Sequence, residues 1–219
     1  MRFLRDNGLT IVLAAVSLMT VIAMILTGWQ VSNHELTEHG ASPMTLGAYA
    51  VSGQFLSALF ENWESEFLQM SAYVMLTAFL FQRGSSESRD PDEEAPQDED
   101  PAKHADDPEA PWPVRAGGMI RSLYSYSLGL SLAALFLVSF LLHLRYSAEA
   151  DNAQSALHGQ PPVGVLEHLG SAQFWFESFQ NWQSEFLSTA VLVVLSIFLR
   201  FKGSPESKPV AAPHSQTGG

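Results

Sequence analysis

The chain has 219 residues, no cysteine, and 11 Lys and Arg against 23 Asp and Glu, for a formal net charge of −12. Without cysteine it can form no disulfide, no thiolate metal site and no cysteine nucleophile. The excess of acidic residues and the lack of a basic stripe exclude a nucleic-acid-binding protein, because a phosphate backbone attracts Lys and Arg.

The first of four apolar blocks is Leu9–Leu26, which carries no charge. It approaches the length of about 20 residues that a helix needs to cross a bilayer. A secretory signal peptide begins in the same way, but Thr27-Gly28-Trp29 lacks a small-residue cleavage pattern. We therefore predict an uncleaved spanning helix over about 7–29.

The other three blocks predict three more spanning helices and an all-α polytopic membrane protein. Leu123–Leu144 is uncharged and predicts a helix over about 122–145. The shorter blocks Phe67–Gln82 and Phe186–Leu199 are each followed by cations. They predict helices over about 61–82 and 180–201.

The sequence repeats itself. Residues 2–89 align with residues 121–208 without a gap at a constant offset of 119, and about 29 of the 88 aligned positions are identical. The longest match sets Phe60-Glu-Asn-Trp-Glu-Ser-Glu-Phe-Leu68 over Phe179-Gln-Asn-Trp-Gln-Ser-Glu-Phe-Leu187. Each half is predicted as helix, loop and helix, so each returns to the membrane face from which it started. The halves then form two parallel repeats about an axis normal to the membrane.

Charge predicts the orientation of these helices. Apart from Arg145, the basic residues lie at the N-terminus, in the central linker and near the C-terminus, and the loops 30–66 and 146–185 contain neither Lys nor Arg. Because cytoplasmic segments of membrane proteins are enriched in Lys and Arg, we predict a multi-pass membrane protein with its basic segments in the cytoplasm. Both termini and the linker are then cytoplasmic, and both loops are external.

The predicted boundaries are repeat 1 over 1–83, a linker over 84–116, repeat 2 over 117–203 and a tail over 204–219. The linker is acidic and rich in proline and has few apolar residues to bury, so we predict that it and the tail are disordered. Each external loop is predicted to carry a short amphipathic helix along the outer membrane surface, near 44–62 and 163–181.

Four strings resemble those of an uncharacterised family of small bacterial integral membrane proteins, a domain of unknown function. They are Thr27-Gly28-Trp29, His39-Gly40, Phe60-Glu-Asn-Trp-Glu-Ser-Glu-Phe-Leu-Gln69 and Gln82-Arg-Gly-Ser-Ser-Glu-Ser88. The resemblance covers about 170 residues in both halves and implies a duplicated multi-helix membrane fold in the bacterial inner (cytoplasmic) membrane, without an activity or catalytic residues. The second copy has Tyr146-Ser147-Ala148 at the first string and replaces Glu61 and Glu64 with Gln180 and Gln183. A site in this motif would therefore differ between the copies.

The motif also supplies the candidate polar site. Its residues are Asn62, Trp63, Ser65 and Glu66 in the first half and Asn181, Trp182, Ser184 and Glu185 in the second. The 17 residues from Glu66 to Arg83 make about 25 Å of helix, which places Glu66 near the outer edge of a hydrocarbon layer of about 30 Å. Either Glu66 and Glu185 face each other and share a proton or bind a cation, or the segment is interfacial and its carboxylates are hydrated.

His39 and His158, each followed by glycine, are secondary candidates. They predict a turn at the same place in both loops. The segment His34-Glu35-Leu-Thr-Glu38-His39 is expected to be a solvated loop, with a loose carboxylate–histidine metal site as the alternative. His34 and His39 are five residues apart, so they do not form the zinc-protease motif, whose histidines are four apart. His168 has no counterpart in the first half and is expected on the solvent surface.

No nucleophile elbow, phosphate loop or dinucleotide fingerprint occurs, so the sequence predicts neither an enzyme nor a cofactor or metal. We expect a non-enzymatic scaffold or accessory subunit in the lipid bilayer. It would pack its helices against a second copy or another membrane protein. The first alternative is a proton- or cation-responsive transporter or channel that uses Glu66 and Glu185. The second is a lipid-modifying enzyme at the outer interface that uses His39, His158 and the glutamates.

Overall fold

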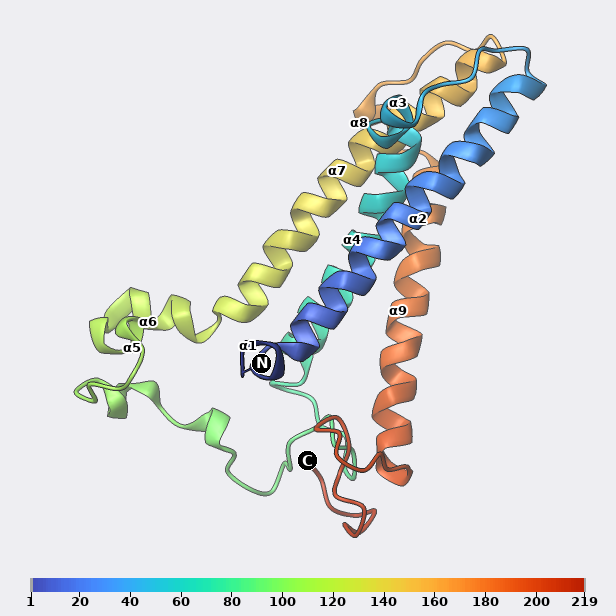
Figure 1. Cartoon of the computed structure of the whole chain (residues 1–219). Coiled ribbons are helices and arrows are strands. Elements are labelled where there is room, and N and C mark those ends of the chain that lie inside the picture. Colours follow the sequence, from blue (N-terminus) through green and yellow to red (C-terminus); the bar gives the residue numbers. More distant parts are fainter. Residues whose placement is uncertain (1, 219) are drawn as a thin grey trace. The chain divides into compact units, whose positions relative to one another are not determined.

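The computed structural model describes residues 2–218, and these residues form helices and no strand (Figure 1). The helices in chain order are α1 (Arg2–Asp6), α2 (Gly8–Glu38), α3 (Leu46–Ala50), α4 (Gly53–Leu76), the 3₁₀ helices η1 (Pro96–Asp98) and η2 (Pro101–His104), α5 (Trp112–Ala116), α6 (Gly118–Ser125), α7 (Ser127–Leu157), α8 (Val165–His168) and α9 (Ala172–Phe198). The chain is therefore all-α, as the sequence predicts.

The structure divides into two compact units. Unit 1 consists of Met1–Glu61 and Phe140–Trp175, and unit 2 consists of Asn62–Ser139 and Phe176–Gly219. Unit 1 contains α2, α3, α8 and the C-terminal half of α7, whereas unit 2 contains most of α4 and α9, the linker and the tail. All eight residues of the predicted polar site belong to unit 2, and both candidate histidines belong to unit 1.

Two helices are long and apolar enough to cross a membrane, α2 and α7, each of 31 residues. In α2 every residue from 9 to 20 is exposed, so its apolar surface has no cover within the described residues. The sequence predicts four such helices, but α4 and α9 do not meet the same criterion. Acids and amides occupy the first half of α4, and the apolar part of α9, from Phe186 to Phe198, is short.

Both long helices end at the predicted histidine–glycine pair. The backbone nitrogen of Ala41 donates to the carbonyl oxygen of Leu36 over 2.8 Å, and the nitrogen of Gln160 donates to that of Ser155 over 3.0 Å. These are Schellman caps, which require a left-handed residue just past the helix. The glycines after His39 and His158 fill that position with φ of 71° and 69°. The helices therefore extend well beyond the predicted ends at 29 and 145.

The segments that follow α2 and α7 differ from the predicted amphipathic helices over 44–62 and 163–181. Each begins with a very short helix, α3 or α8, and the long helices α4 and α9 then start at Gly53 and Ala172. The serine before each start accepts a hydrogen bond from a backbone nitrogen three residues later, from Phe55 to Ser52 (3.3 Å) and from Phe174 to Ser171 (3.2 Å). These N-caps satisfy donors that the first helical turn leaves unpaired, and they fix where the helices begin.

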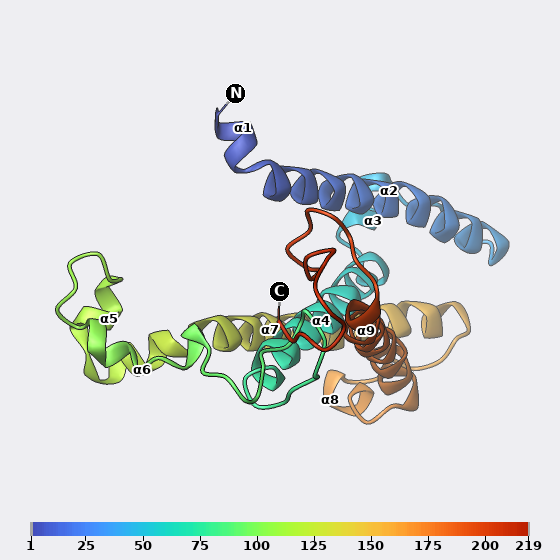
Figure 2. The same ribbon diagram turned by 90° about the horizontal axis from the view of Figure 1, so that it is seen from below.

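The tail packs against the end of α9 in unit 2, and Figure 2 shows it folded back beside that helix. Lys208 is 1% exposed, and its Nζ donates to the carbonyl oxygens of Gly84, His214 (3.0 Å) and Gln216 (2.8 Å). Burial lowers the pKa of this ammonium group, and the nearby charge of Arg200 adds to the effect. The hydrogen bonds of Lys208 hold the last residues of the chain against the segment that follows α4.

Candidate functional site

The predicted polar site lies on α4 and α9 within unit 2, and its residues differ in exposure. Ser65 is 2% exposed, whereas Trp63 is 42% exposed. Glu66 is exposed, and Glu185 is partly buried. The hydroxyls of Ser65 and Ser184 each donate to a carbonyl oxygen three residues earlier in their own helix, at 2.8 Å, that of Asn62 or Asn181. Both serines therefore bond within their own helices, as the matching sequence of the two motifs suggests.

Glu66 and Glu185 lie about one helical turn before Gln69 and Thr189, whose side chains meet between α4 and α9. Two carboxylates at short range repel each other, and a proton or a cation between them removes the repulsion. The amide of Gln69 donates a hydrogen bond to the hydroxyl of Thr189 over 2.7 Å, which joins α4 to α9 directly. Gln69 follows Glu66 by three residues and lies on the same helical face, but the sequence does not show its partner.

Glu64 is a buried acid that the sequence analysis did not select. Its side chain is fully buried, and Oε1 accepts a hydrogen bond from Nε1 of Trp182 over 3.1 Å. The ring of Phe136 contacts Trp182 edge to face, with ring centres 6.1 Å apart. Asn62 and Glu66 are four residues apart and lie on one face of the helix, whereas Glu64 lies on another face. The one sequence feature that distinguishes Glu64 is its replacement by Gln183 in the second half.

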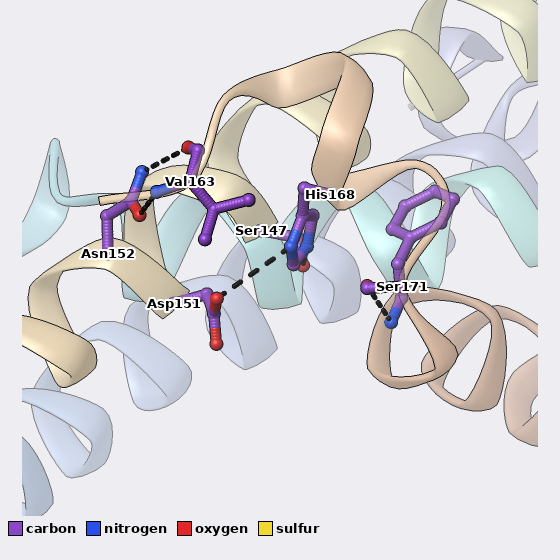
Figure 3. A network of polar contacts seen from close by, with 7 residues as sticks. Ser147, Asp151, Asn152, Val163, His168 and Ser171 are labelled. Atoms are coloured by element: carbon purple, nitrogen blue, oxygen red, sulfur yellow. Dashed lines mark hydrogen bonds and ion pairs between the residues drawn. The ribbon is translucent and has the colours of Figure 1, made fainter. Parts of the chain in front are cut away.

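Two asparagines in unit 1 clasp their own loops in the same way. Asn33 donates from Nδ2 to the carbonyl oxygen of Met44 (3.0 Å) and accepts from its backbone nitrogen (2.7 Å). Asn152 does the same with Val163, at 2.9 Å and 2.6 Å, as Figure 3 shows. Both pairs are 11 residues apart, and the two clasps are related by the offset of 119. Each asparagine therefore holds the loop that follows its helix against that helix.

A polar cluster found only in the second half surrounds His168 (Figure 3). Its Nε2 lies 2.8 Å from Oγ of Ser147, and its Nδ1 lies 3.9 Å from Oδ2 of Asp151. His168 is 2% exposed and its ring centre is 5.8 Å from that of Phe174, so the expectation that it lies in solvent is wrong. The sequence missed its position because the first half offers no histidine there for comparison.

The equivalent positions of the first half suggest what this cluster does. Tyr49 stands where His168 stands in the second half, and Gly28 stands where Ser147 does. A Cβ added to Gly28 would lie 2.1 Å from Oη of Tyr49, so the tyrosine ring rests directly on the glycine. Hydrolases use serine, histidine and aspartate as a nucleophilic triad, but Ser147 is 4% exposed and lies within α7. We interpret both pairs as packing contacts that dock the short helix on the long one.

His39 and His158 meet in unit 1, with ring centres 5.4 Å apart and ring planes at 72°. The sequence predicts a turn at each histidine, and the structure places both turns together. Nδ1 of His39 lies 2.9 Å from the carbonyl oxygen of Glu35, and Nδ1 of His158 lies 3.0 Å from that of Gln154. Within the described residues no group of three or more histidine, aspartate or glutamate side chains is arranged to hold a metal ion.

The comparisons with known proteins give a family and no function. The family described as "Domain of unknown function (DUF6766)" matches residues 1–219. No curated protein and no solved structure matches the chain. Any function must therefore be argued from the residues and their geometry.

Proposed function

The chain belongs to the DUF6766 family, a domain of unknown function, and we propose from its structure that it is a non-enzymatic membrane scaffold or accessory subunit that acts through helix packing. In this proposal α2, α4, α7 and α9 all cross the bacterial inner membrane as two parallel repeats, with both termini and the linker in the cytoplasm. The 24 residues of α4 and the 27 of α9 make helices of about 36 and 40 Å, which is enough to cross about 30 Å of hydrocarbon.

The observation that carries the proposal is the distribution of polar and apolar surface. The polar groups of α4 and α9 bond to each other, through Gln69 and Thr189 and through Glu64 and Trp182. Such bonds join helices where lipid removes the hydrophobic drive to associate. By contrast, α2 presents an uncovered apolar surface along residues 9–20. A helix with this surface needs lipid or another membrane helix around it.

Substituted cysteines test the topology, since the natural chain has none. We expect a membrane-impermeant maleimide to label cysteines at Ala41 and Gln160 in intact spheroplasts. Cysteines at Glu94 and Ser215 should react only after the membrane is opened. Labelling of Ala41 and Gln160 on opposite faces, or of Glu94 in intact spheroplasts, would contradict the parallel arrangement.

Photo-crosslinking along α2 tests the scaffold itself. A photoreactive amino acid is placed in turn at each position from 9 to 20, with position 32 as a control because Ser32 is buried. A protein partner or a second copy should give adducts at a period of about 3.6 residues. Adducts with lipid alone at every exposed position would contradict a scaffold that works through this helix.

The position of Glu66 and Glu185, each about one helical turn from the contact between Gln69 and Thr189, favours a second candidate function, a proton- or cation-responsive transporter or channel. Liposomes that contain the protein would then show a proton or cation flux. The double variant Glu66→Gln, Glu185→Gln removes both charges and should abolish that flux. The control Glu61→Gln changes a glutamate one turn away to the residue that the second half has at this position. A flux that the double variant leaves unchanged would eliminate this candidate.

A further inference from the structure

The two histidine–glycine turns bring one imidazole from each half of the chain into contact. His39 is the C-cap residue of α2, and His158 follows the last residue of α7. Both side chains are exposed, and their ring centres are 5.4 Å apart within unit 1. The offset of 119 residues relates the two histidines, so equivalent positions of the two halves build this contact.

The hydrogen bonds of the two rings fix which nitrogen carries the proton. In each ring Nδ1 lies within 3.0 Å of a backbone carbonyl oxygen, that of Glu35 or of Gln154. A carbonyl oxygen can only accept, so Nδ1 is the donor in both rings. In the neutral imidazole Nε2 then keeps its lone pair. A histidine whose Nδ1–H is held by a backbone carbonyl is the usual form of a metal ligand, because the bond orients the ring.

The separation of the rings matches what a shared metal ion requires. With metal–nitrogen bonds of about 2.0–2.1 Å and a tetrahedral angle of about 109°, two imidazole centres bound through Nε2 lie about 5.2 Å apart. The observed 5.4 Å is close to this value. The angle of 72° between the ring planes also excludes flat stacking, which would turn the lone pairs away from a common point.

The surroundings also favour a cation. The rings lie at the carboxyl-terminal ends of two 31-residue helices, where the helix dipole is negative. The loops 30–66 and 146–185 contain no Lys or Arg to compete with a bound ion. Imidazole nitrogen suits zinc, copper and nickel, whereas magnesium and calcium prefer oxygen ligands.

We propose that His39 and His158 bind one divalent transition-metal ion, with Zn²⁺ as the physiological choice, and that the ion bridges the ends of α2 and α7. Since no third histidine or carboxylate converges on the pair within residues 2–218, water completes the coordination. The ion links the outer turns of the two halves, and its removal frees them. This site stands on its own geometry and does not depend on the scaffold function.

Metal titration of the purified full-length chain in detergent tests the site, with a tag that contains no histidine. The measurements are Zn²⁺ binding by calorimetry and the visible spectrum of Co²⁺ as a spectroscopic substitute. We expect one equivalent of Zn²⁺ per chain, no binding of Mg²⁺, and a midpoint of thermal unfolding that Zn²⁺ raises. The variants His39→Gln and His158→Gln should each weaken binding by more than tenfold and lose the thermal shift.

The matched control is His34→Gln, because His34 is also exposed, lies on the last turns of α2 and pairs with Glu38 at 3.3 Å. It should bind Zn²⁺ like the unmodified chain. Both site variants change exposed side chains, and unfolding curves without metal show whether they fold. Wild-type affinity in either folded site variant, or an equal loss in the His34 control, would overturn the proposal.

Discussion

The contact between Gly28 and Tyr49 offers a sharp test of how the outer helices dock on the long ones. A Cβ at position 28 would lie 2.1 Å from Oη and 2.8 Å from Cζ of the tyrosine, whereas carbon atoms in contact are normally about 3.5–4.0 Å apart. The ring is rigid and 5% exposed, so Gly28→Ser forces it out of its place. Overpacking of this kind costs about 1–3 kcal/mol. Partial exposure of a large side chain adds to this, so we expect a loss of about 2–4 kcal/mol.

The second half of the chain supplies the compensating change. There Ser147 and His168 occupy the same two positions and form a hydrogen bond of 2.8 Å. The double variant Gly28→Ser, Tyr49→His should therefore recover at least half of the lost stability. Recovery stays incomplete because no carboxylate corresponding to Asp151 is present, since Ser32 stands at that position in the first half.

The assay is the free energy of unfolding in mixed micelles, measured by titration with a denaturing detergent and followed by circular dichroism of the helices. Gly47→Ser is the matched control, because nothing lies within 4 Å of a Cβ added there. It should change stability by less than about 0.5 kcal/mol. An equally small effect of Gly28→Ser, or a double variant that is no more stable than Gly28→Ser alone, would refute the docking argument.

Three further predictions follow from contacts within one unit or the other. In a double-mutant cycle, Gln69→Ala and Thr189→Ala should show a coupling of about 0.6–1.7 kcal/mol, and additive losses would mean that the hydrogen bond of 2.7 Å does not join α4 to α9. Asn33→Ala and Asn152→Ala should each cost about 1–3 kcal/mol of unfolding free energy, in equal measure, because each removes two hydrogen bonds to the backbone. Burial raises the pKa of Tyr49, so the unfolded chain loses this proton first and stability should decrease as the pH rises above about 10. Tyr49→Phe should remove this part of the pH dependence, and an unchanged slope in unfolding experiments between pH 9 and 11 would contradict it.

Apolar block length and internal similarity predict the helical architecture because they depend on local sequence. The four blocks each lie within or largely within a long helix, and the helix starts in the two halves keep the offset of 119, from Gly8 to Ser127 and from Gly53 to Ala172. Hydropathy does not predict where α2 and α7 end on their C-terminal sides. Their last turns carry polar residues such as Asn33 and Asn152, which bond to a loop rather than to lipid. The sequence shows those asparagines but not the backbone that they bind.

The candidate sites were predictable only in part, because burial of a polar side chain depends on partners that are distant in sequence. The sequence leaves two interpretations of Glu66 and Glu185, a facing pair or two hydrated carboxylates, and both stay predictions. Glu64 and His168 were missed, since neither follows a helical stripe or recurs in the other half. Their burial depends on Trp182 in one case and on Phe174 in the other.

Several polar residues that the two halves share bind the backbone of their own half, as the serine N-caps and the asparagine clasps do. Two contacts that the halves do not share join side chains instead, Ser147 with His168 and Glu64 with Trp182. His39 and His158 differ from both groups, because they are shared, exposed and in contact with each other. Their backbone bonds orient each ring, and the contact between the rings places two imidazoles where the proposed metal ion would bind.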